Sequence, residues 1–250
     1  MFRSSSTPAI VLKKTRIGEI HKGLTLLTPG AGLLHAVAHG AYKMRSRLRP
    51  CEPFTIIRAY LYHEPVKNQF KLTDAEVVEP LEGVRASVVR FYAASLWAEV
   101  TLKSFGAGES FAELYRLLHD SLLLLDRLPE QRESVLTVQF LMRFLKLSGH
   151  MPELGHCDLC HAAFEPSEAA YLPRETAVLS CGRCAPADSF RVPAGARAYL
   201  LRTLPTSLAQ AARVSLEAEA LASLRKIVFH LVESSLENRL NTLRAGEGIL

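Results

Sequence analysis

The chain has 250 residues, of which 48% are hydrophobic and 22% charged, with a formal net charge of +5. This length allows two modest domains and a small module, and the composition is ordinary for a globular protein. No apolar run is long enough to span a membrane, and the polar, serine-rich residues 1–8 lack the apolar core of a secretory signal.

The positive charge is concentrated in the N-terminal third of the chain. Residues 1–80 hold 12 lysines and arginines against 6 acidic residues, whereas the remaining 170 residues hold 18 against 19. Such a local excess is the electrostatic pattern of a module that binds a polyanion.

The first 80 residues read as five short strands separated by glycine and proline turns. The expected strands are Pro8–Lys14, Lys22–Thr28, Gly32–His39, Pro53–Tyr62 and Asn68–Val78. Five strands in so short a segment fit a small closed barrel. We predict an OB-fold, the five-stranded barrel that binds oligonucleotides, and an SH3-like barrel remains the alternative.

Two groups of basic residues lie in this predicted barrel. The first group lies in a stretch of seven residues after the third strand and consists of Lys43, Arg45, Arg47 and Arg49. The second group lies near the end of the first strand and consists of Lys13, Lys14 and Arg16. In an extended segment, alternate spacing aims all four residues of the first group the same way. We expect them to contact phosphates, with Tyr42 able to stack on a base. The alternative is a charged loop that serves only solubility.

After Pro80 the apolar residues recur every three or four positions, which predicts helices packed on a core. The expected helices are 84–104, Phe111–Leu128, 130–147, Pro193–Leu204 and a last segment of about 28 residues ending near Arg244. The sequence therefore predicts an α+β multidomain protein. Its expected parts are an OB-fold over 1–80, a helical domain over 81–152, a zinc-binding module over 153–190, and the C-terminal part of the helical domain over 191–250.

Two C-x-x-C pairs, Cys157 with Cys160 and Cys181 with Cys184, are separated by 20 residues. This spacing is typical of a structural Zn²⁺ site in which four thiolates close a tetrahedron. Because no position stays open for water, we expect one structural ion that holds together a loop-rich segment too small to fold unaided. Two disulfides, incidental thiols, or a histidine ligand from His156 or His161 remain alternatives.

The sequence also supports one expectation each for Gly182 and Cys51. Gly182, inside the second pair, is expected to allow a tight turn at the metal. Cys51 is left over and is expected to be an unreactive, partly buried thiol. Cysteines used in this way point to a reducing cytosol.

No motif of an enzyme is present. The chain lacks a P-loop, a G-x-S-x-G elbow, an H-E-x-x-H helix and the H-x-E motif of the zinc deaminases. We therefore expect a protein that is not an enzyme.

Several segments, in their order and spacing, resemble the bacterial RecO family of DNA-repair proteins over essentially the whole chain. They are residues 9–13 (AIVLK), Gly18-Glu19, residues 26–28 (LLT), residues 38–41 (AHGA) with Lys43 and Arg45–Arg47, Pro53-Phe54, Glu76, the two C-x-x-C pairs and the long C-terminal helix. The resemblance implies an OB-fold, a helical domain and an inserted zinc module.

The resemblance also implies a mediator of the RecF pathway without catalytic turnover, located in the cytoplasm with the nucleoid. Such a protein binds single- and double-stranded DNA, anneals complementary strands, and associates with RecR and with the acidic C-terminal tail of single-stranded DNA-binding protein. Together these load RecA onto coated DNA. The DNA-contacting candidates are Lys13, Lys14, Arg16, Lys43, Arg45, Arg47 and Arg49.

The chain departs from the family pattern at two places. His161 stands after Cys160 where glycine is common, and residues 240–244 (LNTLR) replace a basic element, so no residue is assigned to a partner-tail pocket. A zinc-stabilised protein-interaction scaffold without direct DNA binding remains the alternative function.

Overall fold

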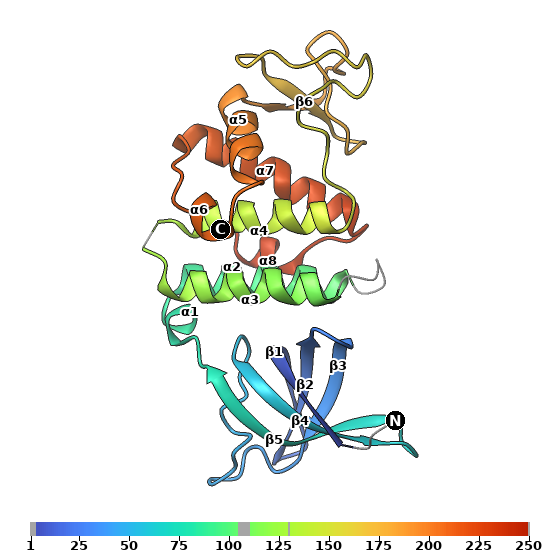
Figure 1. Cartoon of the computed structure of the whole chain (residues 1–250), viewed down its shortest axis with the longest axis vertical. Coiled ribbons are helices and arrows are strands. Elements are labelled where there is room, and N and C mark those ends of the chain that lie inside the picture. The colour runs from blue at the N-terminus through green and yellow to red at the C-terminus, as the bar shows by residue number, and fades with distance from the viewer. Residues whose placement is uncertain (1–3, 105–110, 130, 250) are drawn as a thin grey trace. The chain divides into compact units, whose positions relative to one another are not determined.

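The computed structural model describes residues 4–104, 111–129 and 131–249. Contacts divide the chain into two compact units, Met1–Arg127 and Leu128–Leu250. Figure 1 shows that the first unit holds the barrel with helices α1–α3, and the second holds α4–α8 with the cysteine segment. Among the described helices, none has the length and apolar character needed to cross a membrane.

Five strands close the N-terminal barrel: β1 (Ser4–Ile17), β2 (His21–Thr28), β3 (Gly32–Ala38), β4 (Ile56–Glu64) and β5 (Gln69–Glu79). Their order is β1-β2-β3-β5-β4, and β1 pairs with both β2 and β4. The pairing of β3 with β5 is parallel, whereas the other pairings are antiparallel. This Greek-key closure is that of an OB-fold rather than a simple meander, so the prediction of an OB-fold is confirmed.

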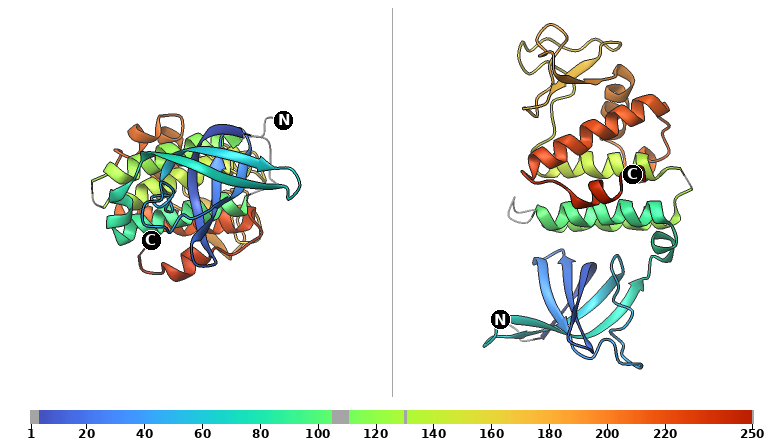
Figure 2. Two further views of the ribbon diagram at one scale, coloured as in Figure 1. Left: turned by 90° about the horizontal axis from the view of Figure 1, so that it is seen from below. Right: turned by 180° about the vertical axis from the view of Figure 1, so that it is seen from behind.

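Alternating side chains fill the barrel, as strand geometry requires. Val11, Leu24, Leu26 and Leu61 are buried in its core. The connection between β3 and β4, residues 39–55, adds Ala41, Leu48 and Cys51 to the same core. The connection leaves β3 at the end of the barrel away from the β2–β3 turn (Figure 2). Its last residues reach the helices, where the Phe54 ring lies 5.4 Å from that of Phe91 and the Pro53 carbonyl accepts from Arg85.

The helices of the first unit pack at the β2–β3 end of the barrel. They are α1 (Glu82–Ala86), α2 (Val88–Lys103) and α3 (Phe111–Arg127). Gly32 has φ +63, and a Cβ there would lie 2.7 Å from the Phe111 ring, so glycine is required at this contact. The single helix expected over 84–104 is wrong at Ser87. That residue is extended and its side chain caps α2 by accepting the Arg90 N–H, which ends one helix and starts the next.

The second unit packs α4 (Glu133–Leu147) against α7 (Ala218–Ser235). Helix α6 (Leu208–Ala211) contacts α4, α5 (Ala194–Thr203) contacts α7, and the short α8 (Asn241–Ala245) ends the unit. Glu130, near the predicted start of the third helix, lies outside the described residues. The expected unbroken C-terminal helix is wrong after Ser235. Glu237 adopts φ +48, and its N–H and that of Asn238 bond back to the Ser234 and Glu233 carbonyls, which closes the helix.

Candidate nucleic-acid interface and metal site

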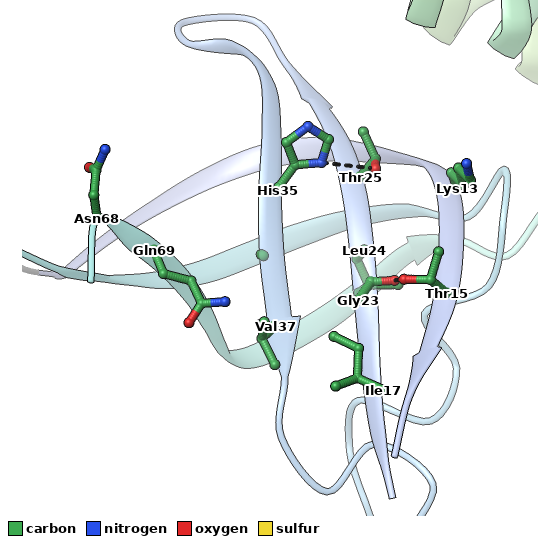
Figure 3. Close-up of a pocket in the computed structure, with 11 residues that line it drawn as sticks. Lys13, Thr15, Ile17, Gly23, Leu24, Thr25, His35, Val37, Asn68 and Gln69 are labelled. Atoms are coloured by element: carbon green, nitrogen blue, oxygen red, sulfur yellow. Dashed lines mark hydrogen bonds between the residues drawn. The ribbon is translucent and has the colours of Figure 1, made fainter. Parts of the chain in front are cut away.

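The outer face of β1, β2 and β3 carries three rows of side chains across the strands. The register aligns Lys13 with Thr25 and His35, and aligns Thr15 with Gly23 and Val37. The third row brings Ile17 opposite His21, whose ring meets that of His39 at a centroid distance of 4.8 Å. Figure 3 shows the first two rows lining a pocket of about 440 Å³, with Asn68 and Gln69 at its far side.

The third row leads directly into the basic connection between β3 and β4. Ile20, His21 and His39 line a second pocket of about 420 Å³ together with Lys43 and Arg45. The Gly40 N–H donates to His21 Nδ1 at 2.9 Å, which fixes the start of the connection against β2. The face of the three strands and the basic connection are therefore continuous at the surface.

Basic side chains surround His39, at the end of the barrel where β3 leads into the connection. Burial, followed by the charges of His21, Lys71 and Lys67, lowers the pKa of His39 below its ordinary value of 6.5. Strands β1, β2 and β3 contain no aspartate or glutamate, whereas β4 and β5 carry Glu64, Asp74, Glu76 and Glu79. The carboxylates of the barrel strands are thus all on β4 and β5, while Glu19 lies in the turn between β1 and β2 and Glu52 in the connection between β3 and β4.

The basic cluster is not extended, so the expectation that alternate spacing aims its side chains together is wrong. Residues 40–51 form successive turns closed by N–H to C=O bonds three residues apart, for example from Lys43 to Gly40 and from Arg49 to Ser46. Lys43, Arg45, Arg47 and Arg49 are all exposed. Arg47 pairs with Asp74 at 3.3 Å, while Lys43 and Arg45 line the second pocket.

The basic group of β1 is divided by strand alternation. Lys13 lies on the outer face beside the first pocket. Lys14 pairs with Glu52, and Arg16 donates to the Gly18 and Glu19 carbonyls at 3.2 Å each. The contribution of each predicted residue to DNA binding stays a prediction.

Lys22 holds the connection between β3 and β4 in place. This residue was not identified as important from the sequence. Its ammonium group is fully buried and donates to the Arg49 carbonyl at 2.7 Å, the Cys51 carbonyl at 3.4 Å and Glu52 at 2.8 Å. The signal was present, because Lys22 shares the inward parity of Leu24 and Leu26 on one strand. Tyr42 is 37% exposed, and its ring centroid lies 5.1 Å from Lys22 Nζ and 5.5 Å from Arg16 Cζ.

The four paired cysteines converge in the second unit. The sulfurs of Cys157, Cys160, Cys181 and Cys184 all lie within 4.8 Å of one another, with Cys160 and Cys181 Sγ atoms 3.8 Å apart. All four are free thiols rather than disulfides, and no histidine belongs to the described cluster. Four sulfur donors converging on one point fit a thiophilic metal ion with tetrahedral geometry.

The backbone around the cluster favours thiolate. Burial opposes ionisation of Cys157, but N–H groups of Cys181, Cys160 and Leu159 lower the pKa of its thiol to about 6. His161, with φ +58, donates its N–H to the Cys157 carbonyl at 2.8 Å and so closes the first turn. The interpretation of Gly182 as the conformationally demanding residue is wrong, because its φ is not in the left-handed region and His161 takes that role.

Hydrogen bonds join the two halves of the cysteine module. Asp158 pairs with Leu179 through both its N–H and its carboxylate, at 2.9 and 2.8 Å. A short antiparallel ladder of β6 (Ala170–Pro173) and β7 (Ser189–Val192) supports them. Arg197 of α5, only 4% exposed, donates to the carbonyls of Leu154, Glu165 and Glu168 and so ties the module to the helices.

The fifth cysteine stands apart from this chemistry. Cys51 is fully buried in the barrel core, and burial raises the pKa of its thiol to about 11. It is therefore a core residue with little thiolate character at neutral pH.

Comparison with known proteins gives concordant results for both parts of the chain. A family model described as the recombination protein O N terminal matches residues 1–81, and one described as the recombination protein O C terminal matches residues 85–244. Proteins named DNA repair protein RecO are among those similar to this chain. The one from Rubrobacter xylanophilus is 31% identical and covers 81% of this chain and 82% of its own. Those from Anaeromyxobacter dehalogenans and Desulfosudis oleivorans are 30% and 28% identical, with 94% and 90% of this chain and 92% of each relative covered.

Proposed function

This chain belongs to the recombination protein O family of DNA repair proteins, and on that premise we propose that it binds single- and double-stranded DNA and anneals complementary strands. The observation that carries the proposal is the face of β1, β2 and β3. It contains no carboxylate and runs into the exposed Lys43 and Arg45. Cations without nearby carboxylates are free to replace the counterions of a phosphate backbone.

Annealing on such a surface needs no catalytic group, and the protein acts without turnover. A basic surface lowers the repulsion between two phosphate backbones, and weak, salt-sensitive contacts let the strands move into register. A mediator of this kind acts with RecR and with the acidic tail of single-stranded DNA-binding protein to load RecA onto coated DNA. It would work beside the chromosome, in the cytoplasm with the nucleoid.

The metal in this proposal is one structural Zn²⁺ held by Cys157, Cys160, Cys181 and Cys184. Four convergent sulfurs leave no open position for water, so the ion contributes to folding and not to catalysis. Its binding would order the segment 153–190 by joining its two halves at one point.

The test is binding of a labelled single strand across a salt series. Replacing Lys43 and Arg45 by alanine should reduce the magnitude of the log–log salt slope by about 1.4, because each phosphate contact on a single strand contributes about 0.7. The matched control replaces Arg58 and Arg127, which pair with Glu76 at 3.9 Å and Glu79 at 3.7 Å, and should leave the slope unchanged.

Two outcomes would contradict the proposal. Equal slopes for the wild type and the Lys43, Arg45 variant would remove the basic connection from the interface. No binding at moderate salt would instead leave a metal-stabilised scaffold for protein partners. Annealing of strands coated with single-stranded DNA-binding protein, with and without that protein's acidic tail, tests the partner part of the proposal.

A further inference from the structure

The pocket on the outer face of the barrel is lined by uncharged polar and apolar residues around a single lysine. Thr25 and His35 lie in the row of Lys13, and the Thr25 hydroxyl contacts His35 Nδ1 at 3.1 Å. Gln69 precedes Phe70, which pairs with Ala36, and in Figure 3 its amide extends toward β3. The pocket lining contains no carboxylate.

The floor of the pocket is low because a glycine occupies the centre of the second row. Gly23 lies between Thr15 and Val37, and a Cβ there would stand 2.5 Å from Thr15 Oγ1. A side chain at this position would therefore both push Thr15 aside and raise the floor. Above it, the side chains of Lys13 and His35 are exposed to solvent.

We propose that this pocket holds one unpaired base of a single DNA strand, with the adjoining phosphate at Lys13. The inference rests on the proposed DNA-binding function and deepens it by assigning a base-binding subsite. The volume of about 440 Å³ lies in the range of small-ligand pockets. Amide and hydroxyl groups can hydrogen-bond the edge of a base, and the His35 ring offers a surface for stacking.

The position of the pocket favours a single strand over a duplex. In a duplex the faces of the bases are stacked on one another, so a base can enter a pocket on a sheet only when it is splayed out. The next row of side chains, at His21 and His39, leads to Lys43 and Arg45. A strand with one base in the pocket can therefore continue its phosphates onto the basic connection.

The experiment compares an ordinary labelled single strand with a strand of equal length that has the same sugar–phosphate backbone and carries no bases. Replacing His35 and Gln69 by alanine should weaken binding of the ordinary strand about tenfold, the size expected for loss of one stacked base. The salt slope should stay unchanged because the lysines and arginines proposed to contact phosphates are kept. The base-free strand should bind the wild type and the variant equally.

The matched control is Tyr60→Ala. Tyr60 is an exposed ring, 38% accessible, on β4, outside the proposed subsite. It should leave binding of both strands unchanged. Thermal unfolding of each variant checks the fold, and His35→Ala alone, which alters one exposed side chain, provides a second variant if the double variant is unstable.

The outcomes separate this inference from the function on which it rests. The inference is overturned if the wild type binds both strands equally well, or if the variant loses affinity equally for both, because the pocket then does not hold a base. In either case, a steep salt dependence of binding would still support the proposed function. If the wild type binds neither strand, the proposed function itself fails. A selective loss for the ordinary strand supports the subsite.

Discussion

Lys22 offers the sharpest test of how the barrel positions its basic connection. The perturbation is Lys22→Met, which keeps a long apolar stem within the core while removing the ammonium group. That group is 1% exposed and is the shared donor to the Arg49 carbonyl, the Cys51 carbonyl and Glu52. Its loss leaves these acceptors without the donor that links them to β2.

The expected cost follows from the burial of the pair. Removing one partner of a buried ion pair typically destabilises a protein by about 3–5 kcal/mol. The Glu52 side chain is 32% exposed and keeps Lys14 as a partner, so we expect the lower end, about 3 kcal/mol. The matched control is Lys14→Met, which removes the other ammonium from the same carboxylate. Because Lys14 is 40% exposed, its loss should cost at most about 1 kcal/mol.

The assay is denaturant unfolding followed by fluorescence of Trp97, the single tryptophan of the chain, which is fully buried on α2 in the same unit as the barrel. A lower transition midpoint with an unchanged slope for Lys22→Met would report the lost stability. If Lys22→Met costs no more than Lys14→Met, the buried ammonium does not hold the connection, and the reasoning is refuted.

Three further predictions concern the same contacts and the metal module. Burial alone would raise the pKa of Glu52, but hydrogen bonds and charges from Lys14 and Lys22 hold that pKa below its ordinary value of 4.5. The ionised carboxylate therefore stabilises the folded protein above that pH, and this stabilisation is lost as the pH falls through the lower pKa of the folded state. Glu52→Gln should therefore flatten the acid side of the stability profile, and an unchanged profile would contradict the assignment. If the four cysteines hold the proposed ion, a chelator should expose amides of residues 153–190 to hydrogen exchange, and Cys181→Ser should do the same. Full protection in the chelated protein would exclude a structural role for the ion. Arg197→Met should lower the stability of the second unit by roughly 2–4 kcal/mol, since three carbonyls lose a charged donor, and a change below 1 kcal/mol by denaturant unfolding would show that the anchor is dispensable.

Local patterns in the sequence were sufficient where a feature depends on neighbouring residues. Runs of strand-forming residues between glycine and proline turns located the five barrel strands, and the C-x-x-C spacing identified the four sulfurs that converge. The positions at which two helices end were not predicted from these patterns. The cap at Ser87 and the left-handed Glu237 depend on single backbone conformations that the apolar periodicity passes over.

The sequence by itself located the five barrel strands, the lack of acidic residues in β1, β2 and β3, and the four cysteines that converge, because these follow from composition, period and spacing within short segments. Only the tertiary structure decided which basic side chains form ion pairs with carboxylates and which stay exposed. It set the buried ammonium group of Lys22 against the Arg49 carbonyl and Glu52, paired Lys14 with Glu52, and folded residues 40–51 into turns. It also placed Thr25, His35 and Gln69 around one pocket, since strand register joins residues far apart along the chain.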